Sequence, residues 1–143
     1  MQALLKKSEY NQLLDECEVA MHQIGAQEFP LKHYFTPGLY LREMFIPKGG
    51  WLTSKVHKTT HSYIVSMGVI NVITDKEIVR VIAPYTGESI KGVRRMGYAL
   101  EDVIWTTIHP NPDNCKDIPT LEARLFQKHR NPLLTAYKKE IKK

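Results

Sequence analysis

The chain has 143 residues, enough for one hydrophobic core and too few for two, so we expect a single domain over residues 1–143. Hydrophobic residues make up 43% and charged residues 24%, which excludes a disordered chain, and no apolar run approaches the ~18 residues that cross a membrane. The net charge of +5 lies partly in the lysines of the C-terminal tail, outside any recognisable nucleic-acid-binding module, so nucleic acid is not an expected partner.

The N-terminal region predicts a cytoplasmic protein that begins with a helix. No apolar segment follows the first lysines, which argues against a secretory signal. Over residues 8–24, apolar side chains recur at steps of three and four, which is one face of a helix. We expect Ser8 to cap its start and Gly25 to end it. The two cysteines, Cys17 and Cys115, form no CxxC pair and are expected to be free thiols.

Residues 37–111 read as short strands. The runs GLYLREMFI, SYIVSMGVINVIT, EIVRVIA and DVIWTTI are rich in β-branched and aromatic residues. The turn signals PKGG, TDKE and PYTG separate them. Strands this short, without intervening helices, predict an antiparallel sandwich or barrel.

The last part of the chain, residues 118–143, predicts two helices. Thr120 is the expected N-cap of the first, over LEARLFQKHR. Pro132 interrupts the pattern, and LLTAYKKEI is expected to form a second, short helix.

The stretch before the second strand-like run carries the side chains most suited to chemistry. Because side chains alternate along a strand, Lys55, His57, Thr59 and His61 would share one face. On a straight strand the two histidines would lie roughly 13 Å apart, too far to share a metal ion. They converge only if the chain bends between them.

This stretch resembles the first sequence motif of the cupins. In that motif two histidines stand one residue apart after a glycine, and a glutamate and a closing glycine follow. Here His57 matches the second histidine and Gly68 the closing glycine. Lys55 replaces the first histidine, and His61 stands where the glutamate is expected.

A second cupin-like motif follows in GESIKGVRRMGYALED. Gly87 matches its opening glycine and Gly92 its turn glycine, whereas Ile90 replaces a proline and Arg95 replaces the histidine. The resemblance implies a mainly β fold: a single antiparallel, jelly-roll-type cupin barrel with an N-terminal helix and C-terminal helices. The chain is also similar to small cupins encoded by phages.

The substitutions leave two interpretations of the site open. His57 and His61 could hold a divalent metal such as Fe, Mn, Ni or Zn, with His33 or His109 as a third ligand, but cations at positions 55 and 95 oppose a metal ion. The same cations could instead bind an anionic small molecule, such as a nucleotide or a sugar phosphate. The residues expected to bind it are His57, His61, Lys55, Arg94, Arg95, Tyr63 and Tyr98, with Trp105 as a further aromatic candidate.

Purely structural roles for the same residues stay open as well. Arg94 and Arg95 could pair with surface carboxylates, and Lys55 could simply extend into solvent. The surface carboxylates considered are Glu43, Glu88, Glu101 and Asp102.

Three functions follow from the resemblance and the charge pattern. The first is a binding protein, in its narrowest form a phage protein that sequesters a host nucleotide signal. The alternative is a cupin enzyme, either a metal-dependent oxygenase or a metal-free isomerase or epimerase in which His57 or His61 acts as base. The third is a structural or interaction role, and a homodimer is expected on general grounds.

Overall fold

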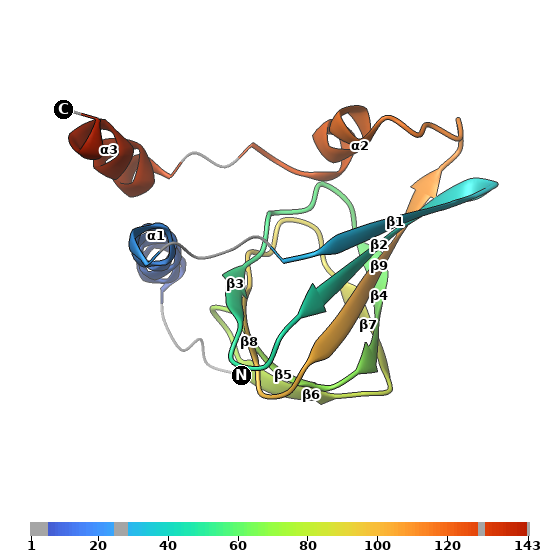
Figure 1. Ribbon diagram of the computed structural model, residues 1–143, viewed down its shortest axis with the longest axis horizontal. Helices are drawn as coiled ribbons and strands as arrows, with labels where there is room; N and C mark the ends of the chain where they lie inside the picture. The colour runs from blue at the N-terminus through green and yellow to red at the C-terminus, as the bar shows by residue number, and fades with distance from the viewer. Residues whose placement is uncertain (1–5, 25–28, 129–130, 143) are drawn as a thin grey trace.

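The computed structural model describes residues 6–24, 29–128 and 131–142, which form two antiparallel sheets flanked by three helices (Figure 1). One sheet has five strands in the order β1-β2-β9-β4-β7, and the other has four in the order β3-β8-β5-β6. The strands are β1 (Leu31–Thr36), β2 (Gly38–Ile46), β3 (Trp51–Thr53), β4 (His61–Met67), β5 (Val69–Ile73), β6 (Ile78–Ile82), β7 (Tyr85–Ser89), β8 (Met96–Ala99) and β9 (Val103–Asn111).

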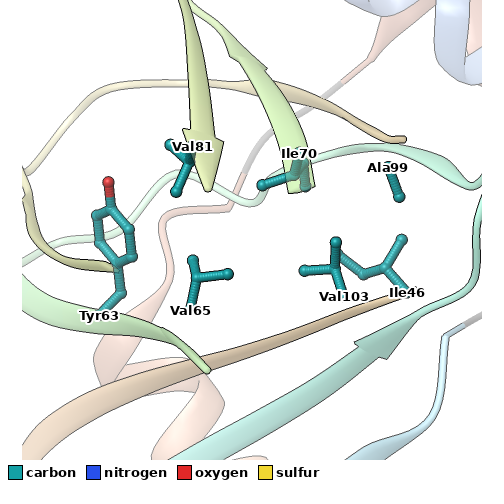
Figure 2. Close-up of a cluster of buried hydrophobic side chains, with 7 residues drawn as sticks. All are labelled: Ile46, Tyr63, Val65, Ile70, Val81, Ala99 and Val103. Carbon is teal, nitrogen blue, oxygen red and sulfur yellow. The ribbon is translucent and has the colours of Figure 1, made fainter. Parts of the chain in front are cut away.

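The sheets face each other across a shared apolar core. Its buried side chains come from both sheets and point toward one another (Figure 2). The mainly β class expected from the sequence is confirmed. Over the described residues no strand pairing joins the two sheets, so they form a two-sheet sandwich and not a closed barrel. The core consists of Ile46, Tyr63, Val65, Ile70, Val81, Ala99 and Val103.

The strand region begins earlier than the sequence predicted. β1, over Leu31–Thr36, pairs with β2 along its whole length, whereas the expected boundary was residue 37. The segment LKHYFT alternates half-buried and exposed positions because it is an edge strand with one solvated face. Its strand propensity is diluted by lysine and histidine, which is why the pattern was missed.

Helix α1 spans Lys7–Gln23 and packs through one face, as its periodicity predicted. It starts one residue earlier than expected: the backbone N–H of Lys6 donates to the Glu9 carboxylate, and Ser8 lies inside the first turn. The expected terminator, Gly25, lies outside the described residues. The buried hydroxyl of Tyr10 lies 2.9 and 2.7 Å from carbonyl oxygens of residues 73 and 94 and ties the helix to the four-stranded sheet.

The two C-terminal helices are α2 (Ile118–Leu125) and α3 (Pro132–Ile141). The N-cap of α2 is Asp117, whose carboxylate accepts the backbone N–H of Thr120 at 3.1 Å, so the expected cap at Thr120 was wrong. α3 lies beside α1, and α2 lies above the sheets (Figure 1). Within the described residues, no helix combines the length and apolar character needed to cross a membrane. Position 143 and residues 129–130 lie outside the described part.

The strand register sorts the inner face of the five-stranded sheet into layers. Tyr40 on β2 pairs with His109 on β9, and His61 on β4 pairs with Ser89 on β7. Ser62 pairs with position 108, so His61 and His109 are neighbours across β4 and β9. All four inward side chains of this layer are buried, which gives one end of the sandwich a polar interior. The layers nearer the other end hold Met44, Trp105 and Val65, then Ile46 and Val103.

Candidate functional site

Three histidines converge in the polar layer. The ring centroids of His57 and His61 lie 4.1 Å apart, because the chain bends at residues 58–59 between them. The sequence predicted that these histidines approach each other only if the chain bends between them, and the structure has this bend. His109 joins them from β9, with its ring centroid 4.8 Å from that of His61. One ring nitrogen from each of the three residues lies within 4.8 Å of the others.

Hydrogen bonds fix two of the rings. The Nδ1 of His61 lies 3.2 Å from the carbonyl oxygen of Thr59, which can only accept, so Nδ1 carries the proton and Nε2 keeps its lone pair. The Nε2 of His109 lies 2.8 Å from the hydroxyl of Thr107. His109 is completely buried, and its Nδ1 has no hydrogen-bond partner. A buried polar atom without a partner is costly, so this nitrogen is a place where a water molecule or a metal ion would bind.

All three imidazoles are held neutral. Burial is the main cause that lowers the pKa of His57 and of His109, each to about 3, with the nearby His61 adding to the effect. Burial also lowers the pKa of His61. Neutral imidazole is the form that binds a transition metal.

The donor set fits a divalent ion. Metal–nitrogen bonds of about 2.1 Å place the nitrogens of a shared ion roughly 3.3 Å apart, whereas the ring nitrogens here lie within 4.8 Å of one another. The three rings would therefore have to move closer together to share an ion. Thr59 and Thr107 then act as the outer partners that orient ligating histidines.

A cavity of about 660 Å³ opens beside the histidines, between the two sheets and under the helices. Side chains from α1, α2 and α3 form part of its wall, so the helices cover the open side of the sandwich (Figure 1). The polar end is formed by His57, His61, Ser89 and Arg95, and the wall beyond it by Met44, Ile46, Leu52, Ile70, Val72, Met96 and Trp105.

Two of the cations at the cavity share one carboxylate. Arg42 lies 3.5 Å and Lys55 3.7 Å from the carboxylate of Glu122 on α2. Both cations also lie over the ring of Phe126, at 4.9 and 5.1 Å from its centroid. The side chain of Lys55 is 63% exposed, so solvent reaches its charge. Neither Glu122 nor Phe126 was singled out from the sequence.

Arg95 differs from these cations. It lines the cavity, and its Nη1 donates to the buried hydroxyl of Ser89. Its charge adds to the burial that lowers the pKa of both His57 and His61. Among the described residues no carboxylate pairs with it within 4.0 Å.

Arg94 does not belong to the cavity. Its guanidinium is buried against α1, 2.8 Å from the Asp15 carboxylate and 2.5 Å from that of Glu18. Both expectations for Arg94 were therefore wrong: it neither faces the barrel mouth nor pairs with the surface carboxylates considered. It holds α1 against the sandwich.

The two tyrosines expected at the site lie elsewhere. Tyr63 is in the apolar core, stacked on Trp105 with centroids 4.2 Å apart, and Gly87 leaves the space for its ring. Tyr98, 42% exposed, pairs with Trp51 in the four-stranded sheet and does not line the cavity. Only Trp105 of the three aromatic candidates reaches the cavity wall.

The third histidine could not be chosen from the sequence, which left His33 and His109 as candidates. The structure selects His109. His33 lies on the edge strand β1, where its Nδ1 is 2.6 Å from the Tyr40 hydroxyl. The alternation of Trp105, Thr107 and His109 along β9 was a usable signal, but only once the inward face of that strand was known.

Phe126 contributes through the backbone as well as its ring. It forms an isolated antiparallel bridge with His57, and its ring packs edge-on against the imidazole with centroids 4.8 Å apart. Two further backbone hydrogen bonds, from Lys58 to Leu125 and from Gln127 to Val56, flank this bridge. The segment after α2 thus holds the bend that carries His57.

Comparisons with known proteins identify the fold. No family model and no curated protein matches the sequence. A cupin-2 domain protein from Shewanella frigidimarina is 14% identical, with a TM-score of 0.50 over 64% of this chain and 90% of that one. KdgF from Halomonas sp. is 15% identical, with a TM-score of 0.49 over 62% and 91% of the two chains. A cupin superfamily protein from Desulfitobacterium hafniense is 8% identical, with a TM-score of 0.47 over 59% and 81%.

The match to the Shewanella structure shows that the β region has the cupin fold. At this identity the likeness concerns the fold alone. What the chain binds has to be argued from its own site.

Proposed function

We propose that this protein is a small-molecule-binding cupin that holds a divalent metal ion through His57, His61 and His109 and binds an anionic ligand beside it, at Arg95. The observation that carries the proposal is the convergence of three neutral imidazoles, two of them buried and one with a ring nitrogen that has no partner. Histidine-rich sites of this kind suit Zn, Fe, Ni or Mn.

One of the two charges that opposed a metal in the sequence is diverted, because Lys55 is held toward Glu122. The guanidinium of Arg95, held by Ser89, stays beside the histidines, where an anionic ligand would balance it. Arg42, like Lys55, is compensated by Glu122. A third imidazole, from His109, replaces the donor lost at position 55.

When bound, the ion would act as a Lewis acid that polarises an oxygen of the ligand. The chain's own residues do the rest: Arg95 orients the anionic group, and the apolar wall excludes water. Thr59 and Thr107 set the direction of two imidazoles. This arrangement suits binding alone and equally suits a metal-dependent enzyme.

The metal-free isomerase or epimerase has less support. A general base works best when its pKa lies near the working pH. Burial lowers the pKa of His57 to about 3, so at neutral pH its imidazole is a weak base.

Metal titration tests the proposal. Chelator-stripped protein is titrated calorimetrically with Zn²⁺, Ni²⁺, Mn²⁺ and, without oxygen, Fe²⁺. We expect one ion per chain for at least one metal, and affinity at least tenfold weaker in His109→Gln. His33→Gln is the matched control, since His33 lies outside the cluster. The proposal fails if no metal binds stoichiometrically, or if both variants bind as the wild type does.

Narrower features remain predictions of the same proposal. Sequestration of a nucleotide by a phage protein predicts tight nucleotide binding without turnover. A homodimer is checked by light scattering, and a cytoplasmic location by fractionation of the producing cells.

A further inference from the structure

Arg95 is a cation that lines the cavity. No carboxylate of the described residues balances its charge. Arg42 and Lys55 share Glu122, and Arg94, behind the cavity, has two carboxylates from α1. Arg95 has only the neutral hydroxyl of Ser89. A guanidinium keeps its charge when half-buried, and such a charge needs a counter-ion.

The lining as a whole carries an unbalanced positive charge. Apart from the histidines, its described members include three cations and two carboxylates, namely Arg42, Lys55, Arg95, Glu18 and Glu122. A metal ion on the histidines adds to this charge. An anionic group at Arg95 therefore balances the cavity.

The core-facing wall of the cavity offers little to a polar molecule, because it is made of thioether, aliphatic and indole side chains from both sheets. Glu18, Thr53, Ser54 and Thr107 also line the cavity, but each already has a hydrogen-bond partner within the protein. Ile46 and Ile70 belong both to this wall and to the apolar core that Figure 2 shows. The cavity is therefore continuous with the core on that side. A ribose or a sugar ring placed against this core-facing wall would lose hydrogen bonds to water without replacement, which is costly.

Resting on the proposed function, we infer that the ligand of this site is a carboxylic acid with an apolar body. Its carboxylate faces the fork of the Arg95 guanidinium, which matches two carboxylate oxygens. Its hydrocarbon or aromatic body lies along Met44, Leu52, Ile70 and Trp105. The volume of about 660 Å³ is within the ~300–1,000 Å³ common for small-molecule sites.

Matched probes test the need for the carboxylate and the need for the apolar body separately. 4-Phenylbutyrate has both the charge and the apolar body. 4-Phenylbutanamide keeps the body without the charge, and gluconate keeps the carboxylate on a polar body. AMP and glucose 6-phosphate represent the nucleotide and sugar-phosphate alternatives. Binding is measured by calorimetry on the full chain, once metal-loaded and once chelator-stripped, with metal content recorded in each sample.

We expect 4-phenylbutyrate to bind at least tenfold more tightly than each of the other probes. Arg95→Met should weaken its binding at least tenfold, whereas the matched Arg80→Met should not, because Arg80 is exposed and lies outside the cavity. Met44→Gln should weaken 4-phenylbutyrate more than gluconate. If Arg95→Met does not fold, Ser89→Ala replaces it as the test variant. Removing the Ser89 hydroxyl frees the Arg95 guanidinium, so the affinity for 4-phenylbutyrate should change.

Tighter binding of AMP, glucose 6-phosphate or gluconate overturns the inference, and so does unchanged 4-phenylbutyrate binding in the Arg95 and Ser89 variants. Stoichiometric metal without binding of 4-phenylbutyrate overturns the inference alone. Arg95-dependent binding of 4-phenylbutyrate in protein that takes up no metal supports it and overturns the metal part of the proposed function.

Discussion

The buried histidines make the stability of the metal-free protein fall as the pH drops below neutrality. Burial lowers the pKa of His109 to about 3, whereas an unfolded histidine has a pKa of 6.5. Above pH 6.5 the imidazole is neutral in both states, and its contribution to stability is fully present. Between pH 6.5 and 3 the unfolded chain binds a proton that the folded chain cannot, so stability is lost as the pH falls.

The size of the effect follows from these two pKa values. At pH 5 the linkage amounts to about 2 kcal/mol for His109 relative to pH 7.5. Burial lowers the pKa of His57 to about 3 as well, and that of His61 in the same direction, so both add to the loss. The charges that face these rings, from Arg42 and Arg95, act in the same direction.

Urea unfolding of chelator-treated protein at pH 7.5 and pH 5 measures this loss. His109→Gln removes one titrating group, so the drop in unfolding free energy between the two pH values should shrink by about 2 kcal/mol. Exposed carboxylates titrate in both proteins and cancel in the comparison. An identical pH dependence of wild type and variant would refute the reasoning.

Three further predictions follow from particular contacts. Gly68→Ala should unfold the protein or lower its stability severely, seen as loss of the thermal transition, because the residue has a positive φ and a Cβ would lie 2.0 Å from the backbone oxygen of Asp102. Arg94→Met should cost about 3–5 kcal/mol in urea unfolding, since it removes the cation shared by the buried Asp15 and half-buried Glu18 carboxylates of α1; a cost below 1 kcal/mol would show that this ion pair does not hold the helix. Phe126→Ala should weaken metal binding and Phe126→Leu should restore much of it, because the side chain packs on His57; equal metal affinity in wild type and both variants would remove its positioning role.

Much of the fold could be predicted from local patterns. The periodicity of α1, the β-branched and aromatic runs of β2 and β9 and the turns between strands depend on neighbouring residues. The requirement for a bend between His57 and His61 also followed from strand geometry. The edge strand β1 was missed because its polar, solvated face weakens the local signal.

The composition of the site depended on contacts between distant parts of the chain. His109 meets His61 only through the register of β4 and β9, which no local pattern specifies. The partners of Arg94 lie on α1, 79 and 76 residues away in the sequence. Phe126 reaches His57 because α2 ends over the bend. Such pairings are decided by how helices dock on the sheets.

The most direct test of the central claim is a crystal structure of the protein purified without chelators, with anomalous data collected at the absorption edge of the metal found. Our account predicts one anomalous peak within coordination distance of His57, His61 and His109, the last binding through its otherwise unpartnered Nδ1. A metal-loaded crystal with its ion elsewhere, and water or a hydrogen-bond partner on that nitrogen, would contradict it.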